Sequence, residues 1–164
     1  MSARLQPSVT RREMAARHVD TVLAIEASAY SFPWTRGNFI DSLAAGHLAE
    51  VLDLEGATVG FFVAMAGVNE LHLLNVTVAS AHQGQGFGSL LLDAVKQHGR
   101  RLGLARLLLE VRQSNQLARE LYERRGLQAV GLRRNYYPAL HGREDAVVMS
   151  LQLLTPDAEV HGLD

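Results

Sequence analysis

Three glycines within five residues, Gly84-Gln85-Gly86-Phe87-Gly88, are the most informative local feature of this sequence. They follow a segment of strand-like composition and precede a long stretch with helical periodicity. Glycine leaves backbone N–H groups unshielded, and at a helix start these groups lie at the positive end of the helix dipole. The segment predicts a strand–loop–helix unit that can hold a phosphate or pyrophosphate. The alternative is a tight turn that only caps the helix.

The remaining elements are predicted from hydrophobic periodicity and from capping residues. Helices are expected at residues 18–28, 35–44 and 86–103, with a short fourth helix that begins after Ser114 or Asn115 and ends near Gly126. Strands are expected at residues 47–54, 58–66, 70–78, 105–111, 127–133 and 145–153, with a loop at 135–143.

This order predicts an α/β (α+β) fold with a mixed, mostly antiparallel central sheet and helices on both faces. We expect a single domain over residues 1–164, with its core at about 8–154 and residues 155–164 left unassigned. In residues 70–78 the apolar positions change from odd to even at Leu74, which predicts a bulge near Leu74-Asn75. A strand buried on both faces would give the same pattern.

Composition excludes several classes of function. The chain has 164 residues and a formal net charge of -1, so we expect no direct binding to nucleic acid. It has no cysteine, and its seven histidines lack the spacing of a ligand set, so no metal site is expected. No apolar run is long enough to span a membrane. We expect a cytoplasmic protein that is a monomer or a weak dimer.

The segment Gln83-Gly84-Gln85-Gly86-Phe87-Gly88 matches the Q/R-x-x-G-x-G/A signature of the GNAT superfamily of acetyl-CoA-dependent N-acetyltransferases. Over roughly residues 10–152 the chain also resembles the RimI branch of that superfamily. The segments that carry this closer resemblance are Phe32-Pro33-Trp34, residues 109–115, Leu121-Tyr122, residues 133–138 and residues 142–146. RimI-type enzymes acetylate the N-terminal alanine of the small-subunit ribosomal protein numbered eighteen.

The resemblance implies a GNAT acyltransferase fold with a bulged strand at the cofactor cleft, and acetyl-CoA as cosubstrate. The residues implied to bind the cofactor are Val76, Thr77 and Val78 for the pantetheine, Gly84, Gln85, Gly86, Phe87, Gly88 and Ser89 for the pyrophosphate, and Asn115. Gly84 and Ser89 stand where the family often has basic residues, which implies that backbone amides carry more of the phosphate binding.

Two residues are candidates for acid–base chemistry. Glu110 lies within an apolar strand, where an unpaired carboxylate is costly, so it is a candidate general base. An ion pair with Arg112 is the alternative. Tyr122 is implied by the resemblance to be the general acid, and the alternative is a core tyrosine with a satisfied hydroxyl. Asn115 has an alternative role as the N-cap of the helix that carries Tyr122.

Four aromatic residues are expected to form the walls of a slot for the acceptor peptide: Phe32, Trp34, Tyr136 and Tyr137. Core anchoring for the first pair and packing of the loop on itself for the second are the alternatives. Candidates to attract a basic peptide are Glu26, Asp41, Glu144 and Asp145. The expected reaction is acetylation of a protein N-terminus, with a ribosomal protein N-terminus as partner. Acetylation of lysine or a small amine, and a non-catalytic CoA-binding module, are the alternatives.

Overall fold

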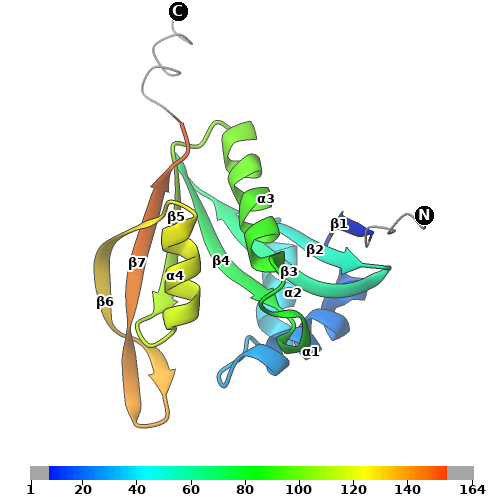
Figure 1. Ribbon diagram of the computed structural model, residues 1–164, viewed down its shortest axis with the longest axis horizontal. Coiled ribbons are helices and arrows are strands. Elements are labelled where there is room, and N and C mark those ends of the chain that lie inside the picture. Colours follow the sequence, from blue (N-terminus) through cyan, green and yellow to red (C-terminus); the bar gives the residue numbers. More distant parts are fainter. Residues whose placement is uncertain (1–7, 155–164) are drawn as a thin grey trace, which may run out of the picture. The chain divides into compact units, whose positions relative to one another are not determined.

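The computed structural model describes residues 8–154 and has one mixed sheet, whose strands are hydrogen-bonded in the order β1-β2-β3-β4-β5-β7-β6 (Figure 1). The strands are β1 (Val9–Glu13), β2 (Leu48–Leu54), β3 (Ala57–Ala66), β4 (Glu70–Val78), β5 (Arg106–Arg112), β6 (Gln128–Ala139) and β7 (Gly142–Gln152). The helices are α1 (Val19–Ala29), α2 (Arg36–Ala44), α3 (Phe87–Arg101) and α4 (Gln116–Arg124), with single 3-10 turns at Ala16–His18 and Ser80–His82. Strands β4 and β5 are parallel, whereas β1–β2, β5–β7 and β6–β7 are antiparallel. The predicted mixed α/β fold is confirmed.

The described chain divides into two units, residues 8–63 with 75–91 and residues 64–74 with 92–154. In the first unit, α2 begins at the N-cap Thr35, whose hydroxyl accepts from the backbone N–H of Asn38. The helix buries Phe39 completely, with its ring 5.4 Å from that of Phe61 on β3 and 5.2 Å from that of Trp34. These aromatic contacts fix α2 on the sheet of this unit.

In the second unit, β4 pairs with β5 from Glu70–Arg106 to Leu73–Leu109. The C-terminal half of α3 packs closely in this unit, since a Cβ added to Gly99 would lie 2.5 Å from Cδ1 of Leu153. A larger residue at position 99 would require the side chain of Leu153 to move. The expectation that residues 1–164 form a single domain stays a prediction, and residues 155–164 lie outside the described part of the chain.

Strand β1 was not predicted, because its sequence Val-Thr-Arg-Arg-Glu shows no alternation of apolar residues and every position is exposed. It is held at the edge of the sheet through polar contacts with β2. Arg11 pairs with Glu50 at 2.8 Å, and Arg12 pairs with the buried carboxylate of Asp53 at 2.7 Å. A charged edge strand also discourages pairing with another sheet.

The side chains of β4 alternate between buried and partly exposed positions without a break from Glu70 to Val78. Asn75 and Thr77 lie on the same buried side as Leu71 and Leu73. The change of parity at Leu74 coincides with these two buried polar residues, and the pairing of β4 with β5 ends at Leu73–Leu109, so the bulge near Leu74-Asn75 stays a prediction. The polar groups of Asn75 and Thr77 can be buried because both donate hydrogen bonds to the carboxylate of Glu26 on α1.

The loop predicted at residues 135–143 is wrong. Strand β6 continues to Ala139 and β7 begins at Gly142, so the two strands form a long hairpin, drawn in yellow and orange in Figure 1. The pairing contains an irregularity in which Arg133 lies opposite Ala146 and Tyr137 lies opposite Glu144. Between these two pairs β6 advances by four residues while β7 advances by two. The strand was not predicted because the residues of this stretch are mostly polar.

Candidate active site

The glycine loop has the backbone geometry of a strand-to-helix anion site. Gly84 and Gly86 have φ angles of +77° and +90°, in the left-handed region that other residues avoid, and a Cβ at either position would meet no atom within 4 Å. Phe87 is buried and anchors the first turn of α3, and its ring lies 6.3 Å from that of His82. The surface at Gly84 and Gly86 is therefore open, while the helix behind it is fixed.

The amides of this loop are available to a ligand. The backbone N–H groups of residues 84–89 make no hydrogen bond to any other described residue. Unpaired N–H groups at the start of a 15-residue helix attract an anion. The predicted set Gly84, Gln85, Gly86, Phe87, Gly88 and Ser89 is thus brought together here, and it fits a pyrophosphate.

Residues Val76, Thr77 and Val78 form the end of β4 that precedes this loop. The carbonyl of Val76 accepts a 3.1 Å hydrogen bond from the hydroxyl of Tyr30, and the carbonyl of Val78 accepts from Nε2 of Gln83 at 3.1 Å. The side chain of Thr77 is buried against Glu26. Both side-chain contacts fix the strand from within its own unit. Burial raises the pKa of Tyr30, so its hydroxyl stays a donor.

Glu110 lies on β5 with its side chain only 6% exposed, and its partners differ from the expected one. Oε2 lies 2.5 Å from Nε2 of His72 on β4, and Oε1 lies 3.2 Å from Nε of Arg133 on β6. The contact with Arg133 is an ion pair, since Oε1 makes no hydrogen bond within the described residues. The alternative pairing of Glu110 with Arg112 is wrong, because Arg112 pairs with Glu144 at 3.0 Å.

These neighbours decide the charge of the Glu110 carboxyl. Burial acts to raise its pKa, but the hydrogen bond and charge of His72, together with the charge of Arg133, outweigh burial and hold the pKa below its ordinary value. The carboxylate is therefore ionised at neutral pH. As a direct proton acceptor it is correspondingly weak.

Helix α4 carries two of the predicted residues. Asn115 is its N-cap, and its Oδ1 accepts from the backbone N–H of Ala118 at 3.2 Å, so the capping role is confirmed. Tyr122 lies on the buried side of the helix and is 8% exposed. Its backbone carbonyl accepts from the N–H of Leu127, which closes the turn into β6. Burial of Tyr122 agrees equally with a catalytic hydroxyl and with a core position.

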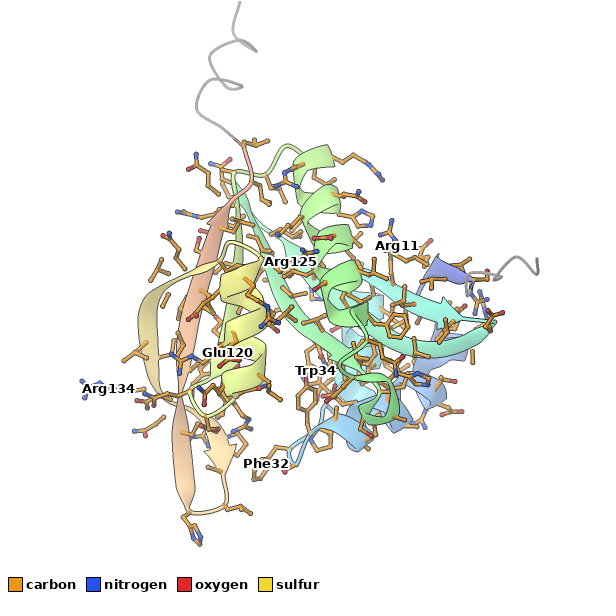
Figure 2. The ribbon with its side chains drawn as sticks, in the orientation of Figure 1. Arg11, Phe32, Trp34, Glu120, Arg125 and Arg134 are labelled. Carbon is orange, nitrogen blue, oxygen red and sulfur yellow. The ribbon has the colours of Figure 1, made fainter. Side chains whose placement is uncertain are left out.

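The four aromatic residues predicted for the acceptor occur as two pairs, one in each unit. Phe32 is 40% exposed and Trp34 partly buried, in the segment between α1 and α2 where Figure 2 labels both side chains. On β6, the rings of Tyr136 and Tyr137 lie 4.9 Å apart, edge to face. The guanidinium of Arg112 lies 4.6 Å from the Tyr137 ring.

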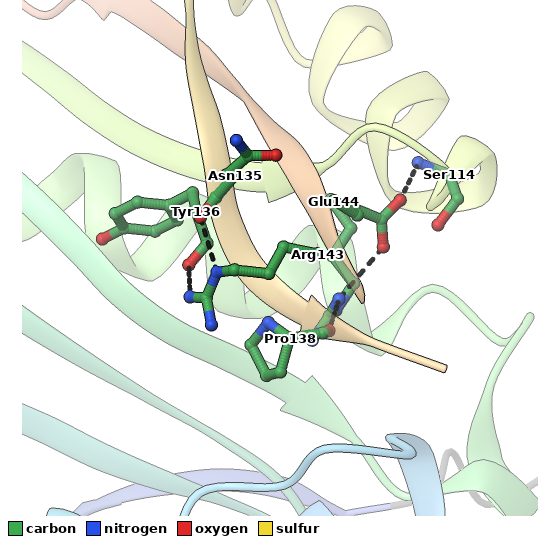
Figure 3. A network of polar contacts seen from close by, with 7 residues as sticks. Ser114, Asn135, Tyr136, Pro138, Arg143 and Glu144 are labelled. Atoms are coloured by element: carbon green, nitrogen blue, oxygen red, sulfur yellow. Dashed lines mark hydrogen bonds and ion pairs between the residues drawn. The ribbon is translucent and has the colours of Figure 1, made fainter. Parts of the chain in front are cut away.

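The irregular part of β6 is held by a network of charged side chains (Figure 3). Arg143 donates from Nε to the carbonyl of Asn135 at 2.7 Å and from Nη2 to the carbonyl of Tyr136 at 2.9 Å. Asp145 accepts from the N–H of Asn135, which has a φ of +52°. The conformation that presents Tyr136 is thus specified by side chains of β7.

Three of the four carboxylates expected to attract a basic peptide have internal partners instead. Glu26 is 2% exposed and accepts from the backbone of Trp34 and from Asn75. Glu144 accepts from Arg112 and from the N–H of Ser114, and these hydrogen bonds lower its pKa. Asp145 holds Asn135. Asp41 is exposed on α2.

The described residues include no cluster of three or more His, Asp or Glu suited to a metal, and no described helix has the length and apolarity to cross a membrane. A hollow of about 430 Å³ lies elsewhere in the first unit, beside Met14, Ile40 and His47. None of the residues predicted for the site lines it.

Comparison with known proteins decides the family. The Acetyltransferase (GNAT) family model matches residues 19–127, about two thirds of the chain. The chain belongs to the GNAT acetyltransferase family. Since GNAT enzymes use acetyl-CoA as acetyl donor, acetyl-CoA is the cosubstrate implied here, and the open glycines and free amides of residues 84–89 fit its pyrophosphate.

Within this family, the chain is 37% identical over 129 residues to the [ribosomal protein bS18]-alanine N-acetyltransferase of Escherichia coli K12, covering 79% of this chain and 87% of that relative. It is 35% identical over 142 residues to the enzyme of the same name from Haemophilus influenzae, covering 86% and 97%. The crystal structure of the ribosomal-protein-S18-alanine N-acetyltransferase from Escherichia coli has a TM-score of 0.84 at 33% identity, covering 90% of this chain and 96% of that chain. The predicted GNAT fold and RimI-type resemblance are confirmed.

His72, Arg133 and Arg143 were not predicted as site residues from the sequence. His72 lies opposite Leu108 in the parallel register of β4 and β5, which makes Glu110 its diagonal neighbour on one face of the sheet. With that register known, the pair could have been predicted. Arg133 and Arg143 were read as parts of a strand end and a loop, so their contacts were not foreseen.

Proposed function

We propose that this GNAT enzyme transfers the acetyl group of acetyl-CoA to the N-terminal α-amine of ribosomal protein bS18, whose first residue is alanine. The observation that carries the proposal is the similarity to bS18-alanine N-acetyltransferases over 87 to 97% of their length. The proposed partner is the free N-terminus of that protein, and the proposed site of action is the cytoplasm. We further propose that residues 1–164 act as one domain, as a monomer or weak dimer.

The acceptor must be a neutral amine when it attacks. An α-amine has a pKa of about 7.7–8.0, so about a quarter of it is neutral near pH 7.4, against about one lysine side chain in a thousand. One general base is therefore sufficient for an N-terminus. We assign this role to the carboxylate of Glu110, acting directly or through an intervening group, because it is a buried ionised acid on a core strand.

The departing thiolate requires a proton or a hydrogen bond. Tyr122 is the proposed donor. Proton transfer from a phenol with an ordinary pKa of about 10 to a thiolate whose conjugate acid has a pKa of about 8.5 costs about 2 kcal/mol of free energy in water. A hydrogen bond from Tyr122 to the developing thiolate avoids this cost. The low exposure of Tyr122, 8%, supports this, because water competes poorly at a buried hydroxyl.

Cofactor binding is assigned to residues of the first unit together with the cap of α4. When bound, acetyl-CoA supplies an activated thioester whose acetyl group is the one transferred. The amides of residues 84–89 hold its pyrophosphate, Val76, Thr77 and Val78 line its pantetheine, and Asn115 is a further contact. The proposal requires the loop and Glu110 to act on the same thioester. Phe32, Trp34, Tyr136 and Tyr137 are the proposed contacts of the acceptor.

An assay with two matched peptides tests the function. Acetyl-CoA is mixed with a short basic peptide that starts with alanine or with the same peptide whose α-amine is blocked, and thiol release and peptide mass are measured. A gain of one acetyl group on the free peptide alone is the expected result. Acetylation of both peptides would assign the enzyme to lysine or broad specificity, and transfer to neither would leave small amines or a binding-only role.

A further inference from the structure

A histidine lies between Glu110 and the surface of its unit. Nε2 of His72 is 2.5 Å from Oε2 of Glu110, and the two side chains are 21% and 6% exposed. An ionised carboxylate can only accept, so the hydrogen of this contact belongs to Nε2. The lowered pKa of Glu110 keeps the carboxylate in that ionised form.

Neither oxygen of Glu110 is well placed to receive a proton from an amine. Oε2 is occupied by His72, and Oε1 is buried beside Nε of Arg133 at 3.2 Å. A proton placed on Oε1 would lie against a permanently charged guanidinium, which opposes protonation. The carboxylate is thus better suited to stabilise a neighbouring positive charge than to take up the proton directly.

The second ring nitrogen of His72, Nδ1, is better placed than Glu110 to receive a proton. With Nε2 carrying the hydrogen, Nδ1 of the neutral ring presents a lone pair. No hydrogen bond joins Nδ1 to another described residue, and the ring is the more exposed member of the pair. A base whose far nitrogen is held by a carboxylate is the arrangement that orients and strengthens histidine in many hydrolases.

We propose that Nδ1 of His72 receives the proton of the acceptor α-ammonium, directly or through one water, and that Glu110 holds the ring and stabilises the imidazolium. This inference rests on the proposed function, because it names the group that performs the proton step. The N–H bond of the ammonium breaks and an N–H bond forms at Nδ1. The electron pair stays on the amine nitrogen for its attack on the acetyl carbonyl, and the imidazolium later releases its proton to water.

The charges around the ring set the expected pH dependence. Among the described residues, the imidazole has one charged group within ion-pair distance, the carboxylate of Glu110 on β5. That carboxylate also lies within ion-pair distance of Arg133 on β6. Only the neutral ring accepts a proton, so kcat/KM is expected to rise with pH.

The test compares the wild-type chain with His72→Gln, His72→Ala, Glu110→Gln and a control, His141→Gln. Glutamine at position 72 can still donate to Oε2 of Glu110 but cannot take up a proton. His141 is an exposed histidine in the turn between β6 and β7. Values of kcat and KM are measured with acetyl-CoA and the alanine peptide from about pH 5.5 to about pH 8.5, a range that brackets the ordinary histidine pKa. Thermal unfolding midpoints verify that each variant folds.

We expect His72→Gln to lower kcat by about a hundredfold or more, to leave KM for acetyl-CoA unchanged and to abolish the histidine limb of the pH profile. Free imidazole added to His72→Ala should restore part of the activity, a result that a structural role would not produce. His141→Gln should match the wild type in both measurements.

Three outcomes would overturn the inference. A His72→Gln enzyme within about twofold of the wild type and with the same pH profile would do so, as would the absence of any imidazole rescue. If Glu110→Gln loses activity while His72→Gln keeps it, the proposed function stands and the role of His72 fails. If the wild-type chain acetylates no amine, the proposed function fails and the inference fails with it.

Discussion

The backbone N–H of Trp34 donates a 2.8 Å hydrogen bond to Oε2 of Glu26, which is 2% exposed on α1. The other oxygen of the same carboxylate accepts from Nδ2 of Asn75 and lies 3.1 Å from the hydroxyl of Thr77, both on β4. No positively charged described side chain lies within ion-pair distance of this carboxylate. One buried acid therefore joins the aromatic segment before α2 to the end of the strand that precedes the glycine loop.

Glu26→Gln is expected to lower the free energy of unfolding by about 1–3 kcal/mol. An amide has one acceptor oxygen, so either Trp34 or the donors of β4 would face an NH₂ group in a buried position. Urea unfolding followed by circular dichroism measures the change. Glu123→Gln, at an exposed position of α4, is the control and should stay within about 0.5 kcal/mol of the wild type.

Gly86→Ala is expected to weaken acetyl-CoA binding by about tenfold, equivalent to about 1.4 kcal/mol, because a φ of +90° strains alanine and turns the loop amides. Isothermal titration with CoA measures the dissociation constant. Gly46→Ala is the matched control, since Gly46 also has a positive φ, +76°, and open space at its Cβ. It should lose similar stability without a change in CoA affinity. Equal affinity for both variants would contradict the assignment of the loop.

Glu110→Gln and Tyr122→Phe should each lower kcat by about a hundredfold or more if they act in proton transfer to and from the reacting groups. Thiol release with the alanine peptide measures both variants. Glu120→Gln, on the exposed face of α4, should keep wild-type turnover. Near-wild-type rates for both Glu110→Gln and Tyr122→Phe would remove these residues from the mechanism.

The contribution of Glu110 to stability should depend on pH. Its pKa in the folded chain lies below the ordinary value of 4.5, so the folded state binds fewer protons than the unfolded state in that range. The stabilisation is fully present above pH 4.5 and is lost as the pH falls through the lowered pKa. Urea unfolding of the wild type and Glu110→Gln over this range should show a difference that shrinks with falling pH. A difference that is constant with pH would contradict the ion-pair account.

Arg143→Ala should raise KM for the acceptor peptide by about threefold to tenfold while kcat changes by less than about twofold. The substitution removes two hydrogen bonds to the carbonyls of Asn135 and Tyr136, which hold the irregular part of β6. Steady-state kinetics with varied peptide concentration measures both constants. Arg101→Ala, at the exposed end of α3, is the control. A loss confined to kcat would argue against a role in acceptor binding.

Sequence periodicity predicted α1, α2, β4 and α3 to within about two residues at each end, because their apolar spacing is regular and capped by Thr35 and the glycine loop. It failed for β1 and for residues 135–143. Both regions are polar, and their pairing is held by polar side-chain contacts with the neighbouring strand: the Arg11–Glu50 ion pair for β1, and the hydrogen bond from the N–H of Asn135 to Asp145 for the end of β6. Such long-range polar contacts leave no periodic signal.

For the site, the glycine loop and Glu110 were predicted because each is unusual in its local setting: three glycines at a helix start, and a charge in an apolar strand. The partners of Glu110 were not predicted, because nothing in the sequence around His72 distinguishes it from other polar residues of a strand. Only the parallel register of β4 and β5 brings the two side chains together.

Helix α3 holds Lys96, the only lysine of the sequence, whose Nζ donates a 2.6 Å hydrogen bond to the carbonyl of Arg125 just after α4. Burial lowers the pKa of this amine. An enzyme that handles reactive thioesters thus carries a single lysine on which stray acylation could accumulate, and acylation there would remove the charge that steadies the end of α4. The hydrogen bond from Lys96 thus couples the charge of one side chain on α3 to the end of α4.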